Sequence, residues 1–133
     1  MTGALDWEEL REAARDARSN AYAPYSSLRV GAAVLASGRV FAGCNVENAS
    51  YPVGLCAERA ALAAAVTAGC RELQAVAIVT DRGLPPCGMC RQALAEFSPD
   101  VPLLLVGDGG EVETSLARLL PSPFPAREEI GRR

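Results

Sequence analysis

The placement of three cysteines and one glutamate constrains this chain more than any other feature of its sequence. The segment Cys56-Ala57-Glu58 opens an alanine-rich stretch of helical character, and Pro86-Cys87-Gly88-Met89-Cys90 opens a second helical stretch further along. A catalytic zinc ion takes three protein ligands in a tetrahedral arrangement and keeps its fourth position for water. Cys56, Cys87 and Cys90 are therefore predicted to bind one zinc ion per chain.

Glu58 lies two residues beyond the first predicted ligand. This short step makes it a poor fourth ligand, but its carboxylate can reach a water molecule at the metal and act as a general acid and base. The chain contains no histidine, which excludes Ser-His-Asp and Cys-His hydrolases and leaves Cys, Asp or Glu as zinc ligands. The pattern predicts a hydrolytic zinc site that activates water.

The composition indicates a small cytoplasmic protein. A chain of 133 residues can bury about 68% of the surface that it exposes when unfolded, so residues 1–133 are expected to form a single catalytic domain. The net charge of −3 argues against a nucleic-acid polymer as partner, because phosphate binding requires a clustered surplus of Lys and Arg. No stretch has the pattern of a signal peptide or a membrane span. The chain is therefore expected in the cytoplasm, without membrane contact, acting on a small molecule.

Hydrophobic periodicity and turn residues predict alternating helices and strands. Asp6 and Glu9 form a capping signal ahead of the first helix. Ser37-Gly38 is typical of a hairpin turn, and Gly69 is expected to end a helix in the left-handed conformation. Helices that alternate with buried strands indicate an α/β fold with helices on both faces of a mixed sheet. The predicted helices cover about residues 6–22, 56–68, 88–97 and 115–120, and the predicted strands cover residues 29–36, 39–46, 73–80 and 102–106.

The chain resembles the small zinc-dependent cytidine deaminases that act on free nucleosides. The motifs that carry the resemblance are Gly43-Cys44-Asn45-Val46-Glu47-Asn48, Cys56-Ala57-Glu58-Arg59 and Pro86-Cys87-Gly88-Met89-Cys90-Arg91-Gln92, of which the last two match the general signature of zinc deaminases. The resemblance implies a three-layer α/β/α sandwich with a five-stranded mixed sheet, and a homotetramer with shared active sites. It also implies hydrolytic deamination of cytidine and deoxycytidine to uridine and deoxyuridine with release of ammonia, a step of pyrimidine salvage.

The resemblance also implies roles for residues around the zinc. Glu58 would carry protons from the attacking water to N3 of the cytosine ring and to the departing amino group, and Arg59 would hydrogen-bond the ligand thiolates. Asn45 and Glu47 stand two apart on an extended segment, so their side chains project to the same side. The family uses such a pair to bind the sugar.

Three further positions belong to the substrate pocket that the resemblance implies. Ala57 lies between the first ligand and the catalytic glutamate. Phe124 matches a C-terminal aromatic residue that in the family reaches the site of a neighbouring subunit and stacks on the pyrimidine. Leu28 stands where the family usually has an aromatic residue in a Tyr-Ser-x-Phe segment. Leu28 is therefore expected to line the base pocket without the ring contact.

Three alternatives share parts of this pattern. A thiol-disulfide oxidoreductase would use only the Cys-x-x-Cys pair, and it leaves Cys56 and Glu58 unexplained. A non-enzymatic zinc module would need a fourth ligand, either Cys44 or Cys70. Blasticidin-type nucleoside deaminases share the zinc motif, but Asn45-Val46-Glu47 favours cytidine as the substrate.

Overall fold

The computed structural model describes residues 5–127 of the chain. Its centre is a five-stranded mixed sheet with the strand order β2-β1-β3-β4-β5. β3 and β4 run parallel, and the other neighbouring pairs run antiparallel. The strands are β1 (Gly31–Ala36), β2 (Arg39–Cys44), β3 (Leu73–Val79), β4 (Pro102–Gly107) and β5 (Gly110–Ser115).

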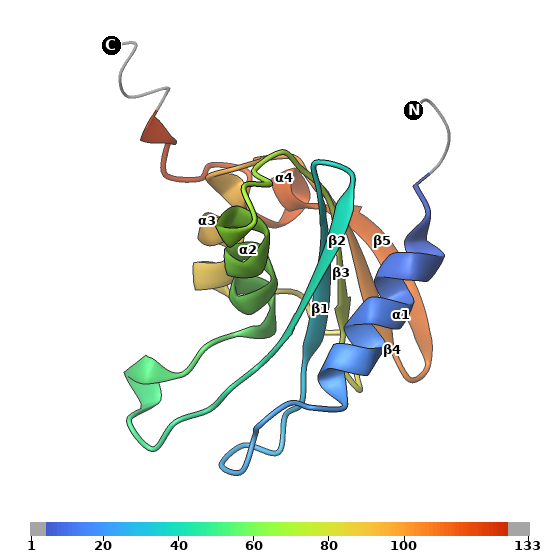
Figure 1. The fold of residues 1–133 in the computed structure, drawn as a ribbon, viewed down its shortest axis with the longest axis vertical. Coiled ribbons are helices and arrows are strands. Elements are labelled where there is room, and N and C mark those ends of the chain that lie inside the picture. The colour runs from blue at the N-terminus through green and yellow to red at the C-terminus, as the bar shows by residue number, and fades with distance from the viewer. Residues whose placement is uncertain (1–4, 128–133) are drawn as a thin grey trace.

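Helices cover both faces of this sheet (Figure 1). Strand residues alternate between the faces, so Ala77 packs in the core on one face and Ile78 in the core on the other. This arrangement confirms the predicted three-layer α/β/α sandwich with a five-stranded mixed sheet. One face carries α1 (Trp7–Arg18), and the other carries α2 (Ala57–Thr67), α3 (Gly88–Ala95) and the short α4 (Leu116–Leu119).

α1 ends earlier than its sequence predicts. The carboxylate of Asp6 accepts a hydrogen bond from the Glu8 amide at 3.2 Å and caps the first turn. The helix stops at Arg18, because the backbone of Tyr22 pairs instead with residues 45 and 47 beyond β2. Long-range backbone pairing has replaced the last predicted helical turn. Within residues 5–127, none of the helices is long and apolar enough to cross a membrane.

Ser37 and Gly38 form the predicted hairpin turn between β1 and β2. Both residues have positive φ, 51° and 78°, and Ala36 pairs with Arg39 directly across the turn. A two-residue turn of this kind matches the twist of the paired strands. β2 therefore returns along the whole of β1 and leaves the sheet after Cys44.

Two glycines let helices lie close to the sheet. A Cβ atom on Gly31 would lie 1.9 Å from the carbonyl oxygen of Ala14 in α1. A Cβ atom on Gly43 would lie 2.6 Å from the backbone nitrogen of Ala61 and 2.9 Å from the carbonyl oxygen of Ala57, both in α2. Because these contacts involve backbone atoms, no side-chain movement can relieve them. The first turn of α2 is thereby held beside the end of β2.

β5 is the strand that local sequence patterns did not reveal. The segment 110–115 is mostly polar and exposed, because it pairs only with β4 at the edge of the sheet. Without a buried face it lacks the hydrophobic pattern that identifies a strand. β3, in contrast, is confirmed as an interior strand with six of its seven residues buried.

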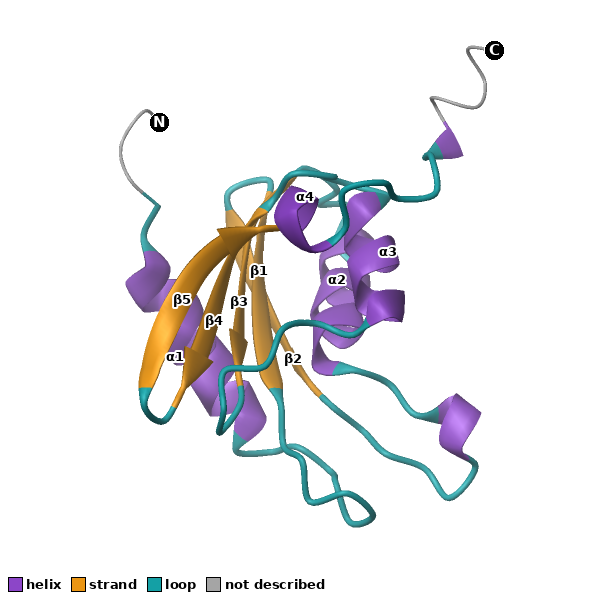
Figure 2. Ribbon diagram, turned by 180° about the vertical axis from the view of Figure 1, so that it is seen from behind, coloured by secondary structure: helices purple, strands orange, loops and turns teal. Residues whose placement is uncertain are grey.

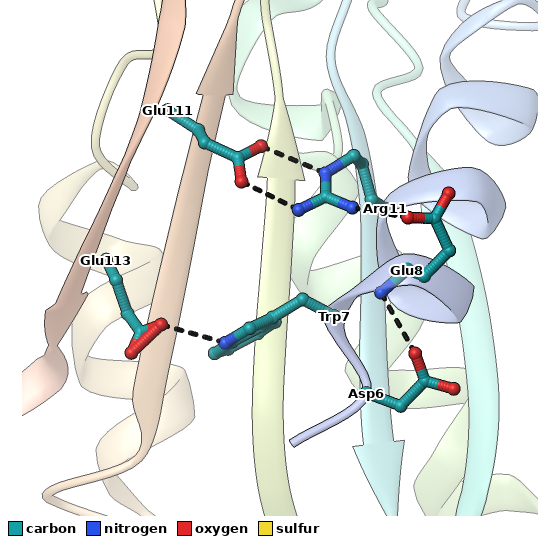
Figure 3. A network of polar contacts seen from close by, with 6 residues as sticks. All are labelled: Asp6, Trp7, Glu8, Arg11, Glu111 and Glu113. Carbon is teal, nitrogen blue, oxygen red and sulfur yellow. Dashed lines mark hydrogen bonds and ion pairs between the residues drawn. The ribbon is translucent and has the colours of Figure 1, made fainter. Parts of the chain in front are cut away.

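Figure 3 shows the polar contacts that join β5 to α1. Arg11 donates from Nε and Nη2 to the two carboxylate oxygens of Glu111 at 2.9 and 2.7 Å. Its Nη1 also lies 3.1 Å from a carboxylate oxygen of Glu8, and Trp7 Nε1 donates to Glu113 at 2.9 Å. The hydrogen bonds from Arg11 hold the pKa of Glu111 below its usual value. α1 thus pairs with the exposed side of the edge strand through a two-point ion pair.

We expect Glu111→Gln to lower the free energy of unfolding by about 0.5–1 kcal/mol at neutral pH, the upper part of the range for exposed ion pairs. Because the folded pKa is depressed, the carboxylate of Glu111 stabilises the fold above its unfolded pKa of ~4.3, and this stabilisation is lost as the pH falls through the lower folded value. The difference between variant and parent should therefore shrink in acid. Denaturant titrations followed by the fluorescence of Trp7, the only tryptophan of the chain, measure it.

Glu113→Gln is the matched control on the same strand, because the glutamine oxygen can still accept the hydrogen bond from Trp7. An equal loss of stability in Glu111→Gln and Glu113→Gln, or a loss in Glu111→Gln that does not depend on pH, would contradict this account of the ion pair.

Candidate active site

Two long connections extend beyond the same end of the sheet (Figure 2), and residues of both border a cleft. They are the α1–β1 connection and the β2–α2 connection, which contains the short 3-10 helix η1 (Tyr51–Val53). Backbone bridges join Tyr22 to Val46 and Val46 to Leu55. Together with the start of α2 and the segment before α3, the connections surround a cleft of about 790 Å³. This volume falls in the range of small-molecule sites.

Three thiols meet beside this cleft, which Cys56 and Cys87 line. The Sγ atom of Cys87 lies 3.8 Å from that of Cys56 and 3.5 Å from that of Cys90, and all three lie within 4.8 Å of one another. Sulfur ligands around a tetrahedral zinc ion at Zn–S distances of about 2.3 Å stand about 3.8 Å apart, so the separations of Cys87 from Cys56 and Cys90 match those of zinc ligands. Within residues 5–127, neither Cys44 nor Cys70 joins this group.

Both helix starts favour thiolates over thiols. Cys56 is the N-cap residue of α2 and Cys87 that of α3, and neither side chain caps a backbone amide. The positive ends of the two helix dipoles therefore stabilise negative charge on the sulfurs. A hydrogen bond from Cys90, together with the Arg59 guanidinium, lowers the pKa of Cys56 to about 5. The same hydrogen bond and burial raise the pKa of Cys90, so the pair shares a proton that a bound metal ion would displace.

Arg59 supplies positive charge next to the sulfurs. Its Nη2 lies 3.5 Å from the Sγ atom of Cys56, and its hydrogen bonds to Cys56 and Cys90 raise the pKa of the guanidinium. Its Nε is buried and has no hydrogen-bond partner among residues 5–127. Three thiolates around Zn²⁺ carry a net charge of about −1, and a guanidinium in this position offsets it.

Glu58 lines the cleft from the first turn of α2, with only 5% of its surface exposed. Burial raises the pKa of its carboxyl group above the usual value, and its own backbone amide opposes the shift. A raised pKa brings a carboxyl group closer to the range in which it can both take up and release protons. Ala57, which is fully buried, also lines the cleft.

Asn45 lines the cleft, but its side chain is largely committed to the fold. Its Oδ1 accepts a hydrogen bond from the Val30 amide at 2.8 Å, and its Nδ2 donates to the carbonyl oxygen of Leu28 at 2.7 Å. Only one N–H and one lone pair of the amide remain. The bonds order the segment that leads into β1, so Asn45 also positions Leu28 at the cleft.

Glu47 organises the loop that borders the cleft. Its Oε1 accepts hydrogen bonds from the amides of Tyr25 and Ser26 at 2.9 and 3.1 Å, and its Oε2 accepts from the Ser26 hydroxyl. Ser26 Oγ in turn accepts from the Leu28 amide at 3.0 Å. The hydroxyl hydrogen bond lowers the pKa of Glu47. The carboxylate therefore stays ionised at neutral pH while it lines the cleft.

The walls of the cleft are mainly apolar. Leu28 lies among them. Several further apolar residues that line the cleft were not predicted from the sequence, because each has the local pattern of an ordinary core or loop residue. They include Val30, Ile78, Leu84 and Met89, which come from separate segments of the chain.

Phe124 is not among the described residues that line the cleft of its own chain. The residue is 72% exposed. The side chain of Gln92 accepts from the Phe124 amide at 3.0 Å and donates to its carbonyl oxygen at 3.1 Å. Arg91 donates to the carbonyl oxygens of Pro86 and Leu119 at 2.8 and 2.9 Å. Arg91 and Gln92, for which the sequence predicted no individual role, tie the C-terminal segment to the segment of the last two cysteines.

Known proteins are similar to this chain over most of its length. A family model described as "Cytidine and deoxycytidylate deaminase zinc-binding region" matches residues 6–104. A cytidine deaminase of Sporosarcina psychrophila is 45% identical over 96% of this chain and 96% of its own. The crystal structure of cytidine deaminase from Burkholderia pseudomallei has a TM-score of 0.85 and 46% identity, over 90% of this chain and 100% of that one. A blasticidin-S deaminase of Bacillus cereus is more distant, 29% identical over 71% of this chain and 76% of its own.

These similarities decide between the alternatives that the sequence left open. A thiol-disulfide oxidoreductase or a non-enzymatic zinc module would not account for an identity of 45% with a deaminase along nearly the whole chain, nor for Glu58 beside the three thiols. The blasticidin-S deaminase shares less of the sequence than the cytidine deaminases do. Fold, thiol site and sequence agree, and the chain belongs to the zinc-dependent cytidine and deoxycytidylate deaminase family.

Proposed function

We propose that residues 1–133 act as one catalytic domain that deaminates cytidine and deoxycytidine by hydrolysis, in pyrimidine salvage. The observation that carries the proposal is the position of Glu58, which is buried two residues from Cys56 in a cleft that also holds the three-thiol site and the carboxylate of Glu47. Acid–base group, metal ligands and a polar group for the sugar thus share one cleft of nucleoside size.

The chemistry assigns one task to the metal and the others to side chains. Cys56, Cys87 and Cys90 would hold zinc, which when bound lowers the pKa of water and makes it a nucleophile at neutral pH. Glu58 would take a proton from the attacking water and deliver it to N3 of the cytosine ring. A new bond forms between the water oxygen and C4, and the bond from C4 to the amino nitrogen breaks. Glu58 would then take the second proton of the former water from the new hydroxyl group at C4 and give it to that nitrogen, so the products are uridine and ammonia.

The carboxylate of Glu47 would recognise the sugar through a single hydroxyl group. A carboxylate offers about four acceptor positions, and the loop at Tyr25 and Ser26 occupies three of them. About one acceptor is left, which suffices for one sugar hydroxyl. A site that binds one hydroxyl in this way can take ribose and deoxyribose alike, which supports both cytidine and deoxycytidine as substrates.

The proposed activity is tested by the loss of cytidine ultraviolet absorbance and the release of ammonia on addition of purified, zinc-loaded protein. Cytidine, deoxycytidine, cytosine and blasticidin S are compared at equal concentration. We expect turnover of both nucleosides. Turnover of blasticidin S alone would assign the site to the antibiotic, and no turnover of any of the four compounds would overturn the proposal.

We expect Glu47→Ala to reduce kcat/KM for cytidine by roughly 1–3 kcal/mol of transition-state binding, about 5- to 150-fold, because a hydrogen-bond partner of the sugar is lost. Activity on free cytosine should not fall, since the base alone does not contact Glu47. Steady-state kinetics on both compounds measure the two effects. Ser26→Ala is the control, because it removes a contact between loop and carboxylate but leaves Glu47 in place. An unchanged kcat/KM for cytidine in Glu47→Ala would exclude Glu47 from sugar binding.

We further propose that the protein is a cytoplasmic homotetramer with shared active sites. Large apolar side chains remain exposed on the loop beside the cleft and on the C-terminal segment, including Tyr51, Val53 and Phe124 at 76%, 65% and 72%. Exposed apolar groups of this kind favour burial against another subunit. The free thiols of the zinc site support a reducing compartment.

Shared sites predict that two inactive variants restore activity together. Phe124→Ala chains keep Glu58, and Glu58→Gln chains keep Phe124, so a mixed tetramer contains sites in which both residues are intact. We expect refolded mixtures to exceed the summed activity of the separate variants. The measurement combines light scattering with a cytidine assay at several mixing ratios. A fully active monomer, or mixtures without any gain, would contradict shared sites.

A further inference from the structure

A second cleft lies on the face of the sheet that carries α1. It has a volume of about 530 Å³ and lies where the parallel strands β3 and β4 end, with Val79 and Val106 at its floor. Three arginines line it: Arg15 and Arg18 from the last turns of α1, and Arg29 from the segment before β1. We call it the arginine cleft. The chain as a whole carries a net charge of −3, so this cleft reverses the charge of the molecule locally.

Backbone oxygens, and not carboxylates, orient two of these arginines. Arg18 Nε donates to the carbonyl oxygen of Arg29 at 2.9 Å, and Arg29 Nη2 donates to that of Ser19 at 2.8 Å. Among residues 5–127, no carboxylate oxygen lies within 4.0 Å of a side-chain nitrogen of Arg15, Arg18 or Arg29. A guanidinium has five N–H donors. Most donors of the three groups therefore remain available to a ligand in the cleft.

The arginine cleft shares a wall with the catalytic cleft. Along the segment before β1, Leu28 and Val30 line the catalytic cleft, whereas Arg29 lines the arginine cleft. At the end of β3 the same alternation occurs, because Thr80 lines the catalytic cleft and Val79 the arginine cleft. Successive residues of an extended chain point to opposite sides. The two clefts are therefore separate sites, back to back across one layer of backbone.

We propose that the arginine cleft binds a small phosphate-bearing anion, either free phosphate or an organic phosphate monoester. Guanidinium groups bind phosphate oxygens through paired, charge-assisted hydrogen bonds, and three of them converge on a concave surface here. Asp108 also lines the cleft, and its carboxylate can accept a hydrogen bond from a hydroxyl group of an organic phosphate. The site is formed without any residue of the catalytic cleft, so the proposal does not depend on the deaminase activity.

The test is a calorimetric titration of zinc-loaded protein with inorganic phosphate at constant ionic strength. We expect saturable binding of one phosphate per chain, and an increase in Kd of about tenfold or more in Arg29→Gln and in Arg15→Gln. Arg15→Gln tests whether misfolding explains a loss of binding. The side chain of Arg15 is exposed and takes no part in the hydrogen bonds of Arg18 and Arg29 to backbone oxygens. Arg118→Gln is the matched control, since it removes the same charge from α4 outside the cleft. Binding that does not saturate, or an equal loss of affinity in Arg118→Gln, would overturn the proposal.

Two further measurements identify the kind of phosphate that binds and the cleft in which it binds. Ribose 5-phosphate that binds more tightly than phosphate, with the difference lost in Asp108→Ala, would identify an organic phosphate, and equal affinity would identify free phosphate. Phosphate binding is then measured again in the presence of saturating uridine. We expect it to persist, because the clefts lie on opposite sides of the wall. Displacement of phosphate by uridine would place the anion in the catalytic cleft and overturn the proposal.

Discussion

Glu58→Gln is expected to keep fold and zinc but to lose turnover by ~10²–10⁴-fold, the range typical of a general acid and base. Glutamine nearly matches the size of the buried glutamate, so the packing around it is preserved. Its amide cannot take a proton from water and pass it to the ring. kcat should fall while KM for cytidine changes little, because the loss arises in the chemical step. Steady-state kinetics together with metal analysis of the same sample measure both effects.

The control for this variant is Glu72→Gln, which makes the same chemical change on an exposed residue outside the catalytic cleft. It should retain the activity of the parent protein. If Glu58→Gln contains one zinc per chain and turns over cytidine within a few-fold of the parent, the proton-transfer role proposed for Glu58 is wrong.

Cys87→Ala is expected to lose the stoichiometric zinc and nearly all turnover. The residue is exposed, so its replacement leaves no core cavity, and the effect should come from the missing ligand. Two thiols alone are a poor zinc site, since catalytic sites use three protein ligands. Metal analysis after dialysis should find one zinc per chain in the parent protein and much less in the variant. Turnover should follow the zinc content.

Cys44→Ala is the matched control, because Cys44 lies outside the three-thiol group of the described residues. It should keep both zinc and activity. Full zinc content in Cys87→Ala, or loss of zinc in Cys44→Ala, would show that the ligand set is not Cys56, Cys87 and Cys90.

Turns and strands that depend only on residues close together in the chain could be predicted from the sequence. Ser37-Gly38 forms a hairpin turn, and Gly69 has a φ of 82° after α2, because left-handed backbone conformations depend on the residue type itself. β3 was predictable because it is buried on both faces, so its nearly continuous apolar run is as long as a strand. β5 and the end of α1 were not predictable in this way, since both depend on pairing with distant segments.

The metal site was predictable for the same reason. Cys56 and Glu58 lie within one helical turn, and Cys87 and Cys90 lie within another. Their relative placement inside each pair follows from helix geometry alone. The sequence could therefore indicate a zinc site, although it did not show that the two helix starts lie side by side.

The sequence by itself determined the three thiols, the glutamate two residues from the first of them and the alternation of helices and strands, because short-range geometry encodes them. Only the tertiary structure decided what surrounds them. It brought Ile78 and Leu84 to the wall of the catalytic cleft, committed Asn45 to the backbone before β1, and placed Arg29 on the opposite side of that segment. These contacts join residues far apart in the chain, and their energies arise only when β1, β3 and the two long connections pack together, so no local pattern records them.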